Sequence, residues 1–157
     1  MYICTHNSRR SHFGQIWAAV AASYYGISHV RTFSGGTEAT AFHPNAIEVL
    51  REAGFEIVTS GANRNPLHDV RFGEQESCTC FSKVYDDPAN PSDLFAAIMT
   101  CSDAEENCPF IPGAEMRTAI PYDDPKAFDA TEQQAEKYRE RSDQIALEIV
   151  YAFSLIQ

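Results

Sequence analysis

The fold of this chain is decided by one stretch near its start, Cys4-Thr5-His6-Asn7-Ser8-Arg9-Arg10-Ser11. The short apolar run before it predicts a β-strand, and residues 11–25 carry apolar side chains at helical spacing. A strand joined to a helix by a short polar loop is the unit from which parallel α/β sheets are built. We therefore expect the first strand of the chain to lie inside such a sheet.

The same loop has the residue types of an anion site. The backbone N–H groups between Cys4 and Arg10 can curl around one small tetrahedral oxyanion at the start of a helix. Arg10 supplies a planar, bidentate donor for that oxyanion, and the helix dipole favours the thiolate form of Cys4. Ser11 can hydrogen-bond the sulfur of Cys4, and Asn7 tolerates the left-handed turn that so tight a loop requires. The pattern predicts a nucleophilic thiol beside an oxyanion cradle.

Chance matches to a Cys-x5-Arg spacing are common, so an ordinary loop without catalysis remains the alternative at this point. His6 and Arg9 need no role in the predicted chemistry, and we expect both side chains to be solvated at the rim of the loop. The flanking strand and the small, polar loop residues favour the catalytic interpretation over the ordinary one.

The rest of the chain alternates predicted strands and helices. Strands are expected at residues 29–33, 55–58 and 94–99, with a turn at Gly35-Gly36, and helices at 44–53 and 131–155, the latter with Thr131 and Gln134 as a capping box. This alternation predicts right-handed crossovers and a parallel sheet. Residues 63–91 fit it least well and are expected to form an extra hairpin-like excursion, from strands near 70–72 and 79–84. We expect residues 1–157 to form a single domain.

Charge and hydropathy restrict the classes of molecule that the protein can bind. The chain has 12 Lys and Arg against 22 Asp and Glu, a formal charge of −10, which disfavours nucleic acid and anionic membranes as partners. No apolar stretch approaches a membrane-spanning length, and the start of the chain does not resemble a secretion signal. We expect a cytoplasmic protein. Because so few residues precede Cys4, we also expect the natural chain to carry further apolar residues upstream of Met1.

Five cysteines are an odd number, which argues against a structural disulfide framework and favours reactive thiols. Cys78 and Cys80 alternate along one predicted strand, so their side chains should share a face. No further Cys or His with zinc spacing lies nearby, and we interpret these two as buried apolar residues. No metal ion and no cofactor are expected.

The stretch from Cys4 to Ser11 resembles the signature of the low-molecular-weight protein tyrosine phosphatase superfamily, which is Cys-x5-Arg-Ser/Thr. The sequence is most similar to the thioredoxin-coupled arsenate reductase branch. Three further segments carry that similarity: residues 34–46, with Ser34-Gly35-Gly36-Thr37 and His43-Pro44-Asn45-Ala46; residues 100–109, which hold Cys101 and Cys108; and Tyr122-Asp123-Asp124-Pro125. The similarity covers most of the chain apart from residues 63–91.

The resemblance implies a fold and a set of roles. The implied fold is a three-layer α/β/α sandwich with a four-stranded parallel sheet and the site at the carboxyl ends of its strands. Cys4 would attack the oxyanion, Arg10 would hold its oxygens, and Asp124, rather than the similar Asp87, would protonate the leaving oxygen. The implied substrate-binding residues are those of the loop: Thr5, His6, Asn7, Ser8, Arg9 and Ser11.

Cys101 and Cys108 decide between two implied reactions. In an arsenate reductase, Cys101 attacks the Cys4–arsenic adduct, arsenite leaves, and Cys108 then attacks the Cys4–Cys101 disulfide. A thioredoxin-like protein finally reduces the Cys101–Cys108 disulfide that remains. A phosphatase acting on small or tyrosyl phosphate esters needs only Cys4 and an acid, and Cys101 and Cys108 would then be two buried thiols that never meet. A catalytically silent oxyanion-binding or redox-sensing module is the third possibility.

Some positions differ from the patterns of both enzyme classes. Gln15 stands where the reductases usually have a glutamate, and Ile120-Pro121 stands where a tryptophan is common. Lys126-Ala127 follow Asp-Pro in place of the aromatic residues of tyrosine phosphatases, although Tyr122 could supply part of an aromatic surface.

Overall fold

The computed structural model describes residues 1–107 and 110–156. Its elements, in chain order, are β1 (Tyr2–Cys4), α1 (Arg10–Tyr24), β2 (Ser34–Gly36), α2 (Pro44–Glu52), β3 (Glu56–Ser60), β4 (Leu67–Arg71), β5 (Ser77–Cys80), β6 (Phe95–Met99), α3 (Ser102–Asn107), β7 (Ala114–Ala119), the 3-10 turn η1 (Pro125–Phe128) and α4 (Gln134–Ser154). Cys108, for which the sequence suggested a role, lies outside the described residues.

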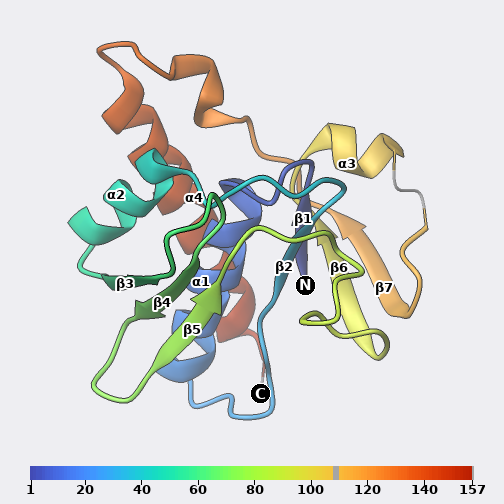
Figure 1. Ribbon diagram of the computed structural model, residues 1–157. Helices are drawn as coiled ribbons and strands as arrows, with labels where there is room; N and C mark the ends of the chain where they lie inside the picture. Colours follow the sequence, from blue (N-terminus) through green and yellow to red (C-terminus); the bar gives the residue numbers. More distant parts are fainter. Residues whose placement is uncertain (108–109, 157) are drawn as a thin grey trace.

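Four strands form the predicted parallel sheet, in the order β2-β1-β6-β7. Helices α1 and α4 cover one face, and the short α3 lies on the other side near the carboxyl ends of the strands (Figure 1). Because both faces are covered, alternate residues of β1 enter different cores. Tyr2 packs with the cluster under α1 and α4, whereas Ile3 packs with Met99 and Ala104. The α/β sandwich with a four-stranded parallel sheet is confirmed.

The position of β2 differs from the expected strand at residues 29–33. Residues 29–33 form no strand, and the predicted turn at Gly35-Gly36 is instead the strand that pairs with β1. Close packing explains the glycines: a Cβ on Gly36 would lie 2.7 Å from both Asn7 N and Thr5 O. Glycine here lets the chain after β2 lie directly against the loop that follows β1.

A second sheet accounts for the excursion. β3, β4 and β5 form an antiparallel sheet in the order β3-β4-β5, which lies in front of α1 in Figure 1. The expected hairpin is therefore present with shifted boundaries. The strand expected at 55–58 was wrongly assigned to the parallel sheet, because the turn at 61–66 is short enough to return the chain directly to an antiparallel partner.

Two further corrections concern the second half of the chain. β7 was not predicted, because its sequence AEMRTA lacks the apolar run of a buried strand, and β7 lies at the edge of its sheet. α4 begins later than predicted and has no capping box: Gln133 is its N-cap residue without a side-chain cap, and Thr131 Oγ1 donates to Phe128 O.

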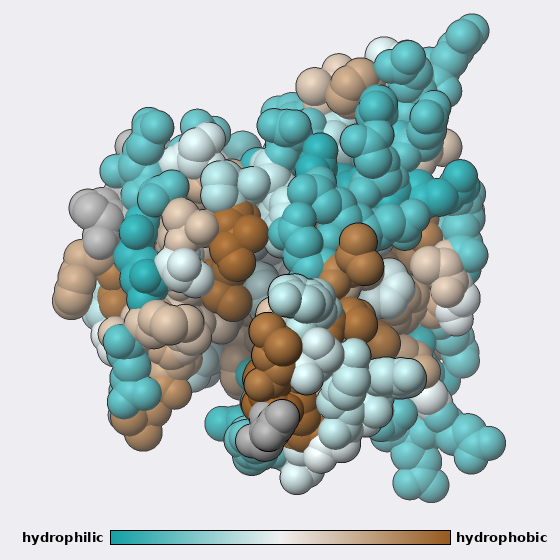
Figure 2. All heavy atoms as spheres, turned by 180° about the vertical axis from the view of Figure 1, so that it is seen from behind, coloured by the Kyte–Doolittle hydropathy of each residue, from teal (hydrophilic) through white to brown (hydrophobic). Residues whose placement is uncertain are grey.

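The surface of α4 is less polar near its carboxyl end. Leu147, Leu155 and Ile156 are exposed there, and the view from behind shows apolar side chains beside this end of the helix (Figure 2). No helix among the described residues has the length and apolar character that a membrane span requires.

Candidate active site

The loop between β1 and α1 is buried and hydrogen-bonded to itself. Cys4 ends β1 with 3% of its surface exposed, and its Sγ lies 3.1 Å from Ser11 Oγ. Asn7 takes the left-handed conformation expected of it, with φ 43°, and its Nδ2 donates to the same Ser11 Oγ at 2.8 Å. This arrangement holds the hydroxyl of Ser11 against the sulfur, where it can stabilise a thiolate.

Neighbouring segments fix the outer side of the loop. The backbone N–H groups of Thr37 and Glu38 donate to the carbonyls of Cys4 and Thr5, and Lys83 N donates to Asn7 Oδ1 at 2.9 Å. These bonds satisfy loop carbonyls and the Asn7 amide from outside and hold the loop against its neighbours. The second sheet contributes here, since Lys83 follows β5 closely in sequence.

His6 and Ser8 also form the rim of the loop. Ser8 Oγ donates to Ala41 O at 2.7 Å, and the carbonyl of His6 accepts a hydrogen bond from Ser82 Oγ. The imidazole of His6 is half-buried and lies 3.8 Å from the exposed carboxylate of Glu38. These two residues therefore connect the loop to the segments beside it.

Arg10 starts α1 and reaches the segment before η1. Its two terminal nitrogens donate to Tyr122 O at 2.8 Å and to Asp124 Oδ2 at 2.7 Å, while its buried Nε has no protein partner. The other oxygen of Asp124 accepts from Lys126 N at 3.0 Å, which caps η1. An oxyanion entering the loop must therefore share Arg10 with Asp124, and the carboxylate of Asp124 lies where it can contact that oxyanion.

The alternative acid, Asp87, lies elsewhere. Its carboxylate accepts from Ala89 N at 2.8 Å within a turn, which is the ordinary structural role of an aspartate before proline. Tyr122 offers no aromatic surface to a substrate, contrary to the suggestion from the sequence. Its ring is buried with 7% exposure, and its hydroxyl donates to Glu148. Burial and the nearby Glu148 raise the pKa of Tyr122.

Arg9 corrects the expectation of a solvated rim residue. It is 7% exposed, and its guanidinium donates to Tyr138 OH at 2.6 Å and to Asp129 Oδ2 at 3.1 Å. Tyr138 OH in turn donates to Asp129 Oδ1 at 2.6 Å, and Asn45 Nδ2 donates to the same oxygen. This cluster joins the loop to α2, η1 and α4, which are separated from it in sequence by up to 129 residues.

The cluster shifts the proton affinities of its members. Burial, followed by the hydrogen bond to Asp129, raises the pKa of Tyr138 to about 12. Burial and the charge of Arg9 lower the pKa of His43, whose ring stacks on Tyr138 at 5.8 Å between centroids. Asp129 could not be found from the sequence, because nothing around it distinguishes it from other polar surface residues, and Asn45 stood out only as part of the His43-Pro44-Asn45-Ala46 segment. Tyr138 carried a signal only as a member of the apolar stripe of its helix.

A second thiol lies against the loop, just after the neighbouring strand β6. Cys101 follows β6, is 1% exposed, and has its Sγ 3.4 Å from Thr5 Oγ1 and 3.4 Å from Ala104 N at the start of α3. The adjacent strands β1 and β6 end at the same edge, which brings Cys4 and Cys101 to one side of the sheet. The structure thus brings together Cys4, Arg10, Asp124 and Cys101.

The remaining sequence features lie outside this site. Gln15 is buried, accepts from Ser34 Oγ at 2.6 Å and donates to Thr79 O. Cys78 and Cys80 lie on the second sheet. In the part of the chain that the structure describes, no group of three or more His, Cys, Asp or Glu residues is arranged to hold a metal ion.

Comparisons with known proteins agree with this geometry. No family model matches the chain. Arsenate reductase 2 of Staphylococcus epidermidis is 30% identical over 127 residues, which cover 79% of this chain and 76% of that protein. The arsenate reductase of Bacillus subtilis is 29% identical over 133 residues, covering 85% of this chain and 78% of that protein.

Solved structures share the fold at lower sequence identity. An arsenate reductase from Archaeoglobus fulgidus superposes with a TM-score of 0.65 at 17% identity, covering 98% of this chain and 97% of that one. A low-molecular-weight phosphotyrosine phosphatase from Vibrio cholerae has a TM-score of 0.64 at 12% identity, covering 98% and 95%. Cys4, Arg10 and Cys101 lie at the carboxyl ends of the central strands, and the arsenate reductase relatives cover most of the chain. The chain therefore belongs to the low-molecular-weight protein tyrosine phosphatase superfamily, in its arsenate reductase branch.

Proposed function

We propose that this chain reduces arsenate to arsenite through a relay of Cys4, Cys101 and Cys108. The observation that carries the proposal is the position of Cys101, whose Sγ lies 3.4 Å from the side chain of Thr5, the residue next to Cys4. A phosphatase needs no second thiol at its loop, whereas a reductase does. The relatives named arsenate reductases support the same choice of substrate.

The first step joins Cys4 to arsenic. Arsenate binds to the loop amides and to Arg10, and the Cys4 thiolate attacks arsenic while one oxygen leaves as water. Asp124 is the proposed proton donor to that oxygen, because its carboxyl group contacts Arg10 at 2.7 Å and so lies beside the bound oxyanion. The hydrogen bond from Ser11 stabilises the thiolate of Cys4 before the attack.

The second step moves two electrons to arsenic. The Cys101 thiolate attacks the sulfur of Cys4, a disulfide bond forms, the sulfur–arsenic bond breaks, and arsenic leaves as arsenite with the bonding pair. Cys108 then attacks Cys101 and releases the Cys4 thiolate. Since α3 begins directly after Cys101, movement of this short helix would let Cys108 approach.

The cycle closes when an external dithiol reduces the Cys101–Cys108 disulfide, and we propose a thioredoxin-like protein as that reductant. The proposal includes a cytoplasmic location, because a relay of free thiols needs a compartment that keeps cysteines reduced.

Phosphatase activity is the second candidate, and the contact of Arg10 with Asp124 supports this reaction as well. Cys4, Arg10 and Asp124 are sufficient for a phosphoenzyme that forms on Cys4 and is hydrolysed by water. The two activities are compatible in one site, since phosphate and arsenate are oxyanions of the same shape and charge. The catalytically silent module requires that neither reaction occurs.

One experiment separates the candidates. Aryl phosphate hydrolysis and arsenate-dependent oxidation of thioredoxin are measured for the wild type, Cys4→Ser, Cys101→Ser and the control Cys78→Ser. A reductase loses arsenate turnover in the first two variants and keeps it in the control. Hydrolysis that is lost only in Cys4→Ser, without any arsenate turnover in the wild type, would identify a phosphatase. Neither activity in the wild type would contradict the proposal and leave a binding module.

A further inference from the structure

A second pair of thiols lies outside the loop, on the antiparallel sheet. Cys78 and Cys80 are two residues apart on β5, so both side chains point to the same face, and their sulfurs lie 4.0 Å apart. Cys80 is fully buried, whereas Cys78 is partly exposed. The backbone ladder with β4 pairs Cys80 with His68 and Cys78 with Val70, which keeps this strand extended.

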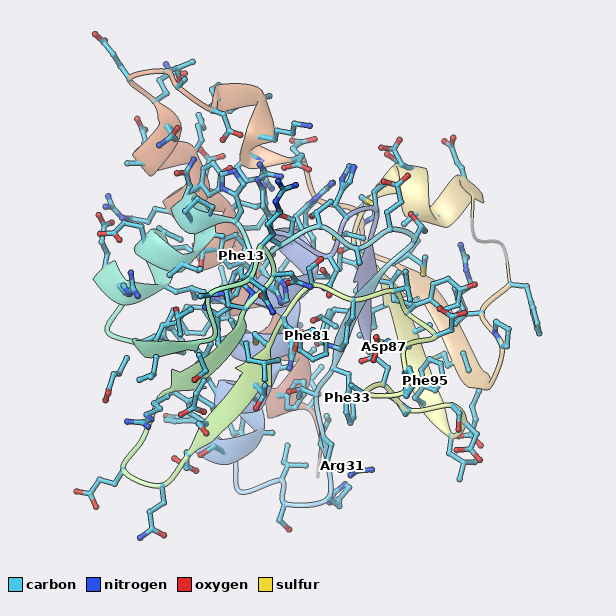
Figure 3. The ribbon with its side chains drawn as sticks, viewed as in Figure 1. Phe13, Arg31, Phe33, Phe81, Asp87 and Phe95 are labelled. Carbon is cyan, nitrogen blue, oxygen red and sulfur yellow. The ribbon has the colours of Figure 1, made fainter. Side chains whose placement is uncertain are left out.

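One thiol of the pair, that of Cys78, lines a large cavity. Cys78 lines a cavity of about 710 Å³ between α1, the chain leading into β2, and β5. Its other wall residues include Gln15, Arg31, Phe33, Phe81 and Lys83. Arg31 and Phe33 lie on the segment before β2, with Phe81 facing them from the chain that follows β5 (Figure 3). A volume of this size admits a small molecule together with water.

The strand geometry suits a bridged pair better than a direct disulfide. Residues two apart in an extended strand have Cα atoms about 6.8 Å apart, at the upper limit of the range that disulfides span. A single atom bonded to both sulfurs at about 2.3 Å, the length of a zinc–sulfur bond, would hold them about 3.8 Å apart if bent and about 4.6 Å apart if linear. The two thiols are in hydrogen-bond contact at 4.0 Å, so their sulfurs need to approach by only about 0.2 Å to accept the bent bridge.

From this geometry we propose that Cys78 and Cys80 form a binding site for a trivalent arsenical such as arsenous acid, distinct from the Cys4 loop. Two As–O bonds break and two As–S bonds form, each thiol proton leaves with a hydroxide as water, and arsenic stays trivalent. The third bond of arsenic remains to its hydroxide, so two thiols complete the site. A zinc site needs at least three protein ligands, and no such group exists among residues 1–107 and 110–156.

The surroundings keep Cys80 as a thiol until a ligand arrives. The hydrogen bond with Cys78 and complete burial raise the pKa of Cys80 well above its ordinary value. Lys83 is buried, and its ammonium lies 4.5 Å from the centroid of the Phe81 ring. Burial lowers the pKa of Lys83, and the nearby thiols counteract this effect. A cation at this wall stabilises negative charge on sulfur as the thiol protons leave.

The test counts arsenic atoms bound to the intact chain by mass spectrometry under non-denaturing conditions, with arsenite as the probe. We expect Cys78→Ser and Cys80→Ser each to bind one arsenic fewer than the wild type, because one thiol cannot hold the bridge. Cys4→Ser and Cys101→Ser should keep the arsenic that the second sheet binds. Since Cys78 is partly exposed, Cys78→Ser tests the site even if Cys80→Ser is destabilised.

Three outcomes would overturn the proposal. The first is equal arsenic uptake by the wild type and Cys78→Ser. The second is displacement of the arsenic by an equal concentration of Zn²⁺, which would indicate a metal site. The third is loss of both thiol hydrogens in place of arsenic uptake, which would indicate a disulfide. Arsenate turnover is measured separately, and its loss in Cys4→Ser with arsenic still bound at Cys78 and Cys80 distinguishes this site from the proposed reaction.

Discussion

The parallel sheet and the antiparallel sheet bury their strands to different degrees. Every residue of β1 and β2 is buried, and helices or loops cover both faces of their sheet. In the antiparallel sheet, β4 alternates, with His68 and Val70 buried, whereas β3 buries only Ile57. Each sheet also holds a thiol pair, Cys4 with Cys101 and Cys78 with Cys80.

The difference shows what makes a thiol chemically active. Cys4 lies where a strand ends before the N-terminus of a helix, beside Arg10 and Ser11. Cys78 and Cys80 lie within an antiparallel ladder, where the strand ends point in opposite directions and no helix begins. In the first case, the N-terminus of a helix and a guanidinium place an oxyanion site beside the nucleophile. In the second case, the hydrogen bond with Cys78 and burial raise the pKa of Cys80, and the two thiols become ligands only when they act together.

The largest effect expected from this comparison is on catalysis. Cys4→Ser should lower the rate of aryl phosphate hydrolysis and of arsenate turnover by at least about 10⁴-fold, because the nucleophile is removed. Cys78→Ser should leave both rates unchanged. Steady-state assays on both variants check the prediction, and an equal loss in Cys78→Ser would remove the distinction between the two thiol pairs.

The next effect concerns α3. Residues seven apart on a helix are separated by about 10.5 Å along its axis, whereas the Cα atoms of a disulfide lie roughly 4.4–6.8 Å apart. Forming a Cys101–Cys108 disulfide should therefore unwind α3, and amides in 102–107 should exchange hydrogen nearly as fast as an unstructured chain. Amides of β5 serve as the control and should be unchanged. Identical protection in the reduced and oxidised protein, with the disulfide verified by mass, would argue against the relay.

A smaller effect tests the core beneath the antiparallel sheet. Val70 is fully buried, and Val70→Ala should lower the free energy of unfolding by about 2 kcal/mol through lost burial and the cavity left behind. Val58 on the neighbouring strand is 38% exposed, and Val58→Ala should change the free energy of unfolding by less than about 0.5 kcal/mol. Denaturant titrations measure both values. Similar values for the two variants would mean that this sheet contributes no core of its own.

The smallest effect is expected from the hydrogen bond that joins the loop to α4. Tyr138→Phe should lower the free energy of unfolding by about 1 kcal/mol, because Arg9 and Asp129 lose a buried hydrogen-bond partner. The pKa of Tyr138 is raised from about 10 to about 12, so the folded state holds the phenol proton more tightly than the unfolded state. The stability that this group contributes is complete below pH 10 and is lost as the pH rises towards 12.

Comparing stability at pH 9 and pH 12 should therefore show a smaller loss in Tyr138→Phe than in the wild type. Tyr151→Phe, which changes an exposed tyrosine on the same helix, is the matched control and should behave like the wild type. If Tyr138→Phe loses as much stability as the wild type over this range, the raised pKa of Tyr138 plays no part in the alkaline transition.

Features that depend on neighbouring residues could be predicted from the sequence. One strand–loop–helix unit contains the predicted helix of residues 11–25, the left-handed Asn7 and the contact of Ser11 with Cys4. Chain geometry leaves few alternatives within so short a unit. The parallel sheet followed from the alternation of elements. β3 was assigned to the wrong sheet, because an apolar run predicts a strand but does not identify its partner.

By itself, the sequence determined the anion-binding loop and the α/β class, since these depend on spacing within a few residues and on the period of apolar side chains. Only the tertiary structure decided that Arg9 is buried against Tyr138, that Cys101 contacts Thr5, and that Cys78 opens onto a cavity. The first two contacts join residues 129 and 96 positions apart. Such contacts are set by how whole elements pack, because no local dihedral angle or hydrophobic period encodes a partner so distant in the chain.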